Sequence, residues 1–143
     1  MSAAGKASTR FSVLPGLLCD GSMWTGVIAP LSERGDVRVA DFSTQDSIMA
    51  MAQTALALFD GPMIAVGHSM GGRVALEMTR LMPERIAALV LLDTGLHPKR
   101  DGEEVNRQKL VDLAYQDGMA ALADAWLPPM VLESRHNEAA LMV

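Results

Sequence analysis

The segment AVGHSMGGRVALEM, Ala65–Met78, places a serine between two glycines where an apolar run meets a helical pattern. Gly67 and Gly71 stand two residues before and two residues after Ser69. A sharp strand-to-helix turn crowds the backbone at its apex, and flanking glycines relieve that crowding. Such a turn lifts the serine hydroxyl clear of the sheet and aims the positive end of the following helix at it. The spacing predicts that Ser69 is a nucleophile and that the Met70 N–H stabilises an oxyanion. The alternative is a tight turn whose serine has no chemical role.

A second loop fits the same chemistry. Pro15–Gly21 contains two glycines and a proline and follows the first predicted strand, Phe11–Leu14. If the second strand lies outside the first and the third lies on its other side, the strand order reverses between strands one and three. Loops leaving such a pair face one crevice at the carboxyl ends of the strands. Leu17 is then the expected second N–H donor to an oxyanion.

The elements that must position these loops alternate along the first two-thirds of the chain. Apolar runs and period-two patterns predict four strands, at Phe11–Leu14, Asp36–Ala40, Met63–Val66 and Ile86–Leu92. Helical patterns between them predict helices at Met23–Leu31 with Ser22 as N-cap, at Ser47–Phe59 and at Met70–Met82. This alternation predicts an α/β fold, a parallel sheet with helices on both faces.

The strand Ile86–Leu92, IAALVLL, is wholly apolar, which predicts burial on both faces. No further strand is expected after Leu92. Helices are predicted over Glu103–Tyr115 and Met119–Trp126, with another starting near Asn137. We therefore expect a partial core over residues 1–98 and a helical tail over residues 99–143.

Composition restricts the class of protein. Half of the 143 residues are apolar, 20% are charged and the net charge is −5, which indicates a globular chain and disfavours nucleic acid or an anionic membrane as partner. No apolar run approaches the roughly 18 residues of a membrane span. The N-terminus has no apolar signal segment, and the lone Cys19 fits a reducing compartment, so a cytoplasmic location is expected.

Three stretches resemble one known family. GHSMGG resembles the nucleophile elbow of the α/β hydrolases, LVLLD resembles the strand after their elbow helix, and LPGLLCDGSMW resembles their oxyanion loop. The likeness covers roughly residues 10–95, with Pro15-Gly16 where many members have His-Gly, and the helical tail resembles the start of a cap or lid. The resemblance implies a Ser69 nucleophile, oxyanion donors at Met70 and Leu17, a small-molecule acyl substrate, and no cofactor or metal.

The family's acid and histidine usually follow later strands, and none is predicted here. Asp93 and His136 occur in the permitted order, but a turn-capping role for Asp93 and a helix-start role for His136 are the expected alternatives. His97 either lines the site or lies in a solvated loop, and His68 is expected to make a local hydrogen bond. We therefore expect catalysis to be incomplete in this chain, with little turnover by the 143 residues alone.

Apolar residues near the elbow suggest a pocket, with Leu18, Trp24 and His68 as possible lining. Trp24 could equally pack under the loop, and Cys19 is expected to be a small buried residue. The leading hypothesis is a serine hydrolase acting on a carboxylic ester or thioester-type bond. The alternatives are a non-catalytic fragment or pseudoenzyme that acts by binding, and half of an assembly completed by another chain. Self-association through the unpaired edge of Ile86–Leu92 is also expected.

Overall fold

The computed structural model describes residues 8–138, and its contacts divide the chain after Leu96 into two compact units. The first unit contains a four-stranded, wholly parallel sheet. Its strands are β1 (Thr9–Leu14), β2 (Gly35–Val39), β3 (Met63–His68) and β4 (Ile86–Leu92). Their spatial order is β2-β1-β3-β4, so the order reverses between β1 and β3, which is the condition under which the sequence places two loops at one crevice.

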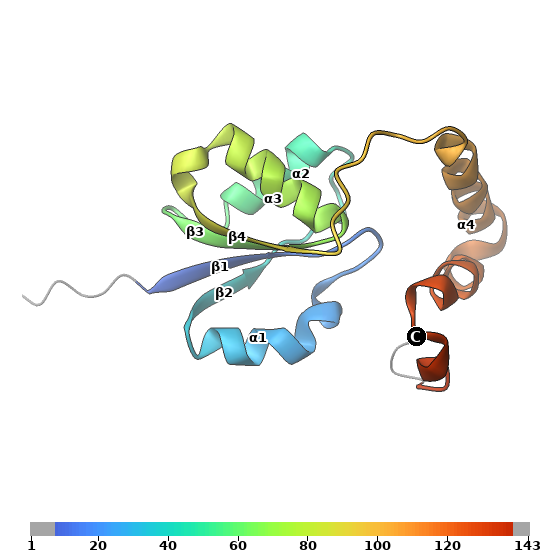
Figure 1. Ribbon diagram of the computed structural model, residues 1–143, viewed down its shortest axis with the longest axis horizontal. Helices are drawn as coiled ribbons and strands as arrows, with labels where there is room; N and C mark the ends of the chain where they lie inside the picture. Colours follow the sequence, from blue (N-terminus) through green and yellow to red (C-terminus); the bar gives the residue numbers. More distant parts are fainter. Residues whose placement is uncertain (1–7, 139–143) are drawn as a thin grey trace, which may run out of the picture. The chain divides into compact units, whose positions relative to one another are not determined.

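Helices cover both faces of this sheet, which confirms the predicted α/β class. Helix α1 (Thr25–Ser32) lies on one face, and helices α2 (Ile48–Leu56) and α3 (Met70–Leu81) lie on the other (Figure 1). Each face has its own buried cluster. Phe11, Val13 and Val66 pack with Trp24 on the α1 side. The cluster on the other side combines strand and helix residues, among them Leu14, Met63, Ala65, Val74 and Met78.

The starts of two helices show how local polar groups set element boundaries. Ser47 caps α2, because its side chain accepts a hydrogen bond from the Ala50 N–H. Before α1 the chain forms a short 3-10 helix, η1 (Gly21–Trp24). The cap of η1 is Asp20, whose carboxylate accepts from the Ser22 N–H at 2.8 Å, and the Ser22 cap predicted from the sequence is wrong. A carboxylate two residues upstream of an N–H is the better acceptor here because it carries full charge.

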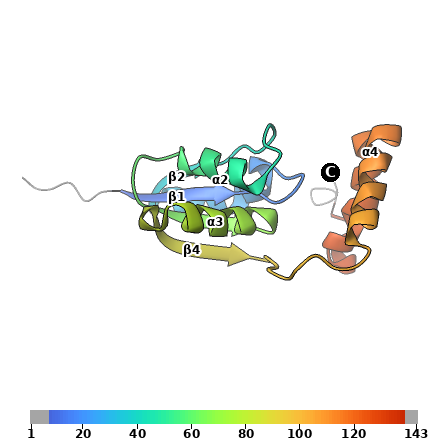
Figure 2. The same cartoon turned by 90° about the horizontal axis from the view of Figure 1, so that it is seen from above.

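Strand β4 pairs with β3 and is an outer strand of the sheet. Figure 2 shows it at the edge. Its side chains are half-buried or exposed throughout, so the predicted burial on both faces is wrong for the described residues. Ile86 and Leu89 pack against the cluster on the α2–α3 side. The cluster on the α1 side reaches β3 but includes no β4 residue, because α1 packs on the β1–β2 half of the sheet.

The second unit consists of helices. Helix α4 (Glu103–Trp126) is followed by short 3-10 helices, η3 (Pro128–Met130) and η4 (Glu133–Arg135). Gly118 has φ 87° and ψ 175°, so α4 is two helical stretches that meet at a glycine, close to the predicted break before Met119. Most of the helix predicted to begin near Asn137 falls outside the described residues.

Among the described residues there is no strand after β4. Over the same residues, no helix combines the length and apolar character that crossing a membrane requires.

Candidate active site

Ser69 occupies the turn between β3 and α3 in a backbone conformation that non-glycine residues rarely adopt. Its φ is 52° and its ψ is −114°. Such a conformation costs about 1–3 kcal/mol and persists only where neighbouring groups hold it. The Ser69 N–H donates to Leu92 O at 2.9 Å, and Ser69 O accepts from the Gly72 N–H at 3.1 Å. The end of β4 and the first turn of α3 thus hold the apex of the turn.

The glycines around Ser69 are required by close backbone approach. A Cβ on Gly67 would lie 2.4 Å from Gly71 O, and a Cβ on Gly71 would lie 2.1 Å from Leu14 O. Real side chains do not tolerate either distance, and the atoms met are rigid backbone. The predicted reason for the glycine spacing is therefore confirmed, and Gly71 also lets α3 approach the end of β1.

The loop after β1 comes to the same place. A Cβ on Gly16 would lie 3.5 Å from Ser69 Cβ and 3.0 Å from His68 Nδ1. The structure therefore brings the Pro15–Gly21 loop and the Ser69 turn together, as predicted from the strand order. Among residues 8–138, neither the Leu17 N–H nor the Met70 N–H donates to another protein group. Free N–H groups beside a serine hydroxyl are what an oxyanion site requires.

The side chains of this loop differ from expectation at two positions. Leu18 has φ 59° and is 57% exposed, and Cys19 is exposed rather than buried. The Cys19 N–H donates to Gly16 O at 3.2 Å. Partial desolvation, aided by the neighbouring Asp20 carboxylate, raises the pKa of the Cys19 thiol, which disfavours the reactive thiolate.

Trp24 lies beneath the loop in the apolar cluster on the α1 side and is 2% exposed. Of the two alternatives open at the sequence level, packing describes this position. Its indole N–H has no partner among the described residues.

The imidazole of His68 lies between Gly16, in the loop after β1, and Asp93, which follows β4. Its Nε2 is 4.0 Å from Asp93 Oδ2, and its Nδ1 is buried without a hydrogen-bond partner among the described residues. Among the described residues, the local hydrogen bond expected of His68 is therefore missing. Asp93 is 93% exposed in its side chain and has φ 48°.

The other two histidines belong to the second unit. His97 Nδ1 lies 3.0 Å from Pro98 O. His136 Nε2 lies 3.0 Å from Pro128 O and 2.9 Å from Val131 O, so that nitrogen serves a local turn.

Thr94 is a residue at the site that the sequence analysis missed. Its Oγ1 lies 3.2 Å from both Ser69 O and Leu92 O. A Cβ on Gly72 would lie 1.8 Å from this hydroxyl oxygen, so Thr94 covers the space that Gly72 leaves open. The doubled glycine in GHSMGG was a visible signal that something packs there, but only the register of β4 beside β3 identifies the neighbour.

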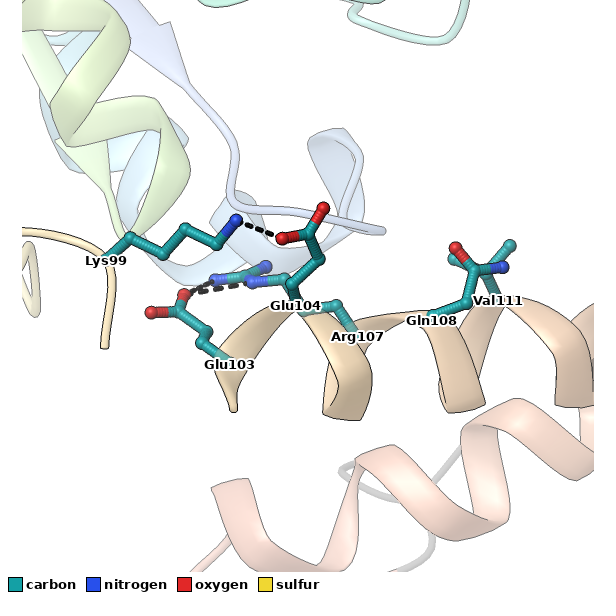
Figure 3. Close-up of a pocket in the computed structure, with 6 residues that line it drawn as sticks. All are labelled: Lys99, Glu103, Glu104, Arg107, Gln108 and Val111. Atoms are coloured by element: carbon teal, nitrogen blue, oxygen red, sulfur yellow. Dashed lines mark hydrogen bonds and ion pairs between the residues drawn. The ribbon is translucent and has the colours of Figure 1, made fainter. Parts of the chain in front are cut away.

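A hollow in the second unit lies along the first half of α4 and is lined by Lys99, Glu103, Glu104, Arg107, Gln108 and Val111 (Figure 3). Its charges pair with one another, Lys99 with Glu104 and Arg107 with Glu103, the latter at 2.7 Å. Among residues 8–138, no group of three His, Cys, Asp or Glu side chains is placed to hold a metal ion.

Comparisons with known proteins agree with this geometry. Residues 29–126 match the model of the α/β hydrolase fold family. A lipase of Mycobacterium tuberculosis, LipV, is 39% identical in an alignment of 88 residues, and the match covers 55% of this chain and 33% of that protein. A Bacillus subtilis protein assigned as a 2-succinyl-6-hydroxy-2,4-cyclohexadiene-1-carboxylate synthase is 40% identical over 65 residues, 43% of this chain and 24% of that protein.

A solved structure extends the likeness to the described fold. The malate-bound thermophilic esterase from Thermogutta terrifontis superposes with a TM-score of 0.80 at 23% identity, covering 95% of this chain and 56% of the esterase. The chain spans a third or less of the curated relatives and just over half of the esterase. The family match includes the Ser69 turn and covers more than half of the chain, and the chain therefore belongs to the α/β hydrolase fold family.

Proposed function

We propose that this chain carries the nucleophile and the oxyanion donors of a serine hydrolase that cleaves a carboxylic ester or thioester-type bond in a small acyl substrate. The observation that carries the proposal is the strained turn at Ser69, with two unoccupied N–H groups in the adjoining loops. The names of two relatives, a lipase and an esterase, support ester cleavage.

Each residue has a distinct role in this proposal. The Ser69 hydroxyl oxygen attacks the acyl carbon and forms a tetrahedral intermediate. The Met70 and Leu17 N–H groups donate hydrogen bonds to the oxygen that becomes negative. Among the described residues of the first unit, the Ser69 hydroxyl makes no hydrogen bond, so removal of its proton is assigned to none of them.

Ser69→Ala tests the proposal. It should abolish hydrolysis of 4-nitrophenyl butyrate by the whole protein, a loss of about 10³-fold or more, because no other nucleophile stands at the turn. A fluorophosphonate probe should label the wild-type protein on the peptide that contains Ser69, as read by mass spectrometry. Ser32→Ala is the matched control, since Ser32 lies at the end of α1 and donates to Ile28 O.

Three results would count against the proposal. Turnover that survives in Ser69→Ala with an intact fold would remove Ser69 as nucleophile. Absence of both turnover and labelling in the wild-type protein would favour a binding role for this fold. Formation of 2-succinyl-6-hydroxy-2,4-cyclohexadiene-1-carboxylate without ester cleavage would favour the reaction named for the Bacillus subtilis relative.

A further inference from the structure

The end of β4 and the residues just after it form hydrogen bonds with the Ser69 turn. Leu92 O accepts from the Ser69 N–H at 2.9 Å, and Thr94 Oγ1 lies 3.2 Å from both Leu92 O and Ser69 O. A hydroxyl has one hydrogen, which it shares between two carbonyls or gives to each in turn. The Thr94 hydroxyl therefore contacts Ser69 O directly and also contacts Leu92 O, the acceptor of the Ser69 N–H.

The contact of Thr94 with Ser69 O affects the Met70 N–H, because both atoms belong to the same peptide group. Ser69 C=O and Met70 N–H belong to one planar peptide group and point in opposite directions. A group that fixes the direction of Ser69 O therefore fixes the direction of the Met70 N–H. A hydrogen bond to the carbonyl also polarises the peptide and strengthens its N–H as a donor.

The packing around Thr94 leaves its hydroxyl little freedom. A Cβ on Gly72 would meet Thr94 Oγ1 at 1.8 Å, Thr94 Cβ at 2.7 Å and Thr94 Cγ2 at 2.8 Å. The whole side chain of Thr94 thus lies against the first turn of α3 at Gly72. Gly71 serves a different neighbour, since a Cβ there would meet Leu14 O and Pro15 O. Gly71 therefore allows close approach of the end of β1, and Gly72 allows close approach of Thr94, which follows β4.

We infer that Thr94 is a positioning residue that orients the Met70 N–H through the peptide group shared by Ser69 and Met70. Its effect on catalysis rests on the proposed function of Ser69, but its effect on the turn does not. Thr94 touches no substrate in this scheme and acts through the backbone alone.

Two substitutions separate the hydroxyl from the shape of Thr94. Thr94→Val keeps the branched shape and loses the hydroxyl, whereas Thr94→Ser keeps the hydroxyl. In the whole protein, Thr94→Val should lower kcat about tenfold with KM changed less than about twofold, because a misaimed oxyanion donor weakens the transition state alone. Thr94→Ser should stay within about threefold of the wild-type kcat.

Hydrogen exchange read by mass spectrometry tests the turn without any activity. In the 143-residue chain, Thr94→Val should speed exchange of the Ser69 and Gly72 amides about fivefold, because the carbonyls that accept from them, Leu92 O and Ser69 O, lose the hydrogen bond from Thr94. Thr79→Val is the matched control, because Thr79 Oγ1 donates to Ala75 O at 2.9 Å within α3 and away from the turn. Exchange over α2 and β1 reports whether each variant remains folded.

The outcomes distinguish the two proposals. Unchanged kcat and unchanged Ser69 exchange in Thr94→Val would overturn the positioning role, and so would Thr94→Ser behaving as badly as Thr94→Val. Activity that survives Ser69→Ala would overturn the proposed function, while the exchange result would still decide whether Thr94 holds the turn.

Discussion

The two outer strands of the sheet, β2 and β4, differ in how they meet their surroundings. On β2, Asp36 and Arg38 are exposed and form an ion pair at 3.0 Å, while Val37 and Val39 pack toward the α1 side. Strand β4 has no charged residue, and Val90, Leu91 and Leu92 are each 41% exposed. Charges on an edge strand discourage pairing with another chain, whereas an apolar edge favours it.

The difference shows that the less protected edge is also the one tied to the candidate site. The end of β4 supplies Leu92 O and the Thr94 hydroxyl to the Ser69 turn. Strand β2 makes no such contact, because β1 lies between it and β3. Substitutions in β4 should therefore change the conformation of the Ser69 turn, whereas substitutions in β2 should change only the free energy of unfolding.

The largest expected effect of this difference is on association. We predict that the 143-residue chain self-associates through Ile86–Leu92 and that Val90→Lys makes it monomeric, because a charge on the edge opposes strand pairing. Analytical ultracentrifugation measures the change. Val27→Lys is the matched control, since Val27 on α1 is 40% exposed and Val90 is 41% exposed.

A monomeric wild-type chain would contradict this prediction. If the amides of Ile86–Leu92 were then strongly protected from exchange along the whole strand, another part of the chain would cover the edge. If Val27→Lys made the chain monomeric to the same extent as Val90→Lys, general surface charge rather than the β4 edge would control association.

A smaller effect is expected at the charged edge. The Arg38 guanidinium donates to Leu58 O, pairs with Asp36 and lies 4.4 Å from the centre of the Phe59 ring. Arg38→Met should lower the free energy of unfolding by about 1 kcal/mol, a modest loss because the side chain is half exposed. Urea denaturation in a Val90→Lys background measures it without interference from association.

The control for Arg38 is Arg34→Met. Among the described residues, the exposed Arg34 side chain has no hydrogen-bond or ion-pair partner, so its loss should change stability little. Equal destabilisation by the two substitutions would mean that the contacts of Arg38 contribute nothing specific.

Much of this fold follows from local sequence. Periodicity locates all four strands and three helices of the first unit within a few residues, and the glycine spacing identifies the Ser69 turn. The alternation of strands and helices predicts the parallel sheet, and the strand order seen in the structure brings the Gly16 loop to Ser69. These features depend on neighbours in the chain or on rules that hold for most parallel sheets.

What local sequence misses depends on which atoms meet in space. The apolar run of β4 predicts burial on both faces, yet helix α1 packs over the other half of the sheet. From the sequence, Thr94 is an ordinary loop residue. The register of β4 on β3 pairs Leu92 with His68 and so brings Thr94 beside Ser69. Cys19 is a residue type that is often buried, yet it is exposed in the loop after β1.

The smallest predicted effect lies between the two edges, on the central strand β1. Ser12 is fully buried, pairs in register with Arg38 and Ala65, and its hydroxyl has no partner among the described residues. Burying an unpaired hydroxyl is unfavourable, so Ser12→Ala should raise the free energy of unfolding by up to about 1 kcal/mol. Ser32→Ala is the contrast, because the exposed Ser32 hydroxyl donates to Ile28 O at 2.8 Å and no gain is expected. Urea denaturation of both variants in the Val90→Lys background decides the matter. A loss of stability in Ser12→Ala would mean that this hydroxyl has a partner inside the sheet, and that the centre of the sheet, like β2, depends on a polar contact.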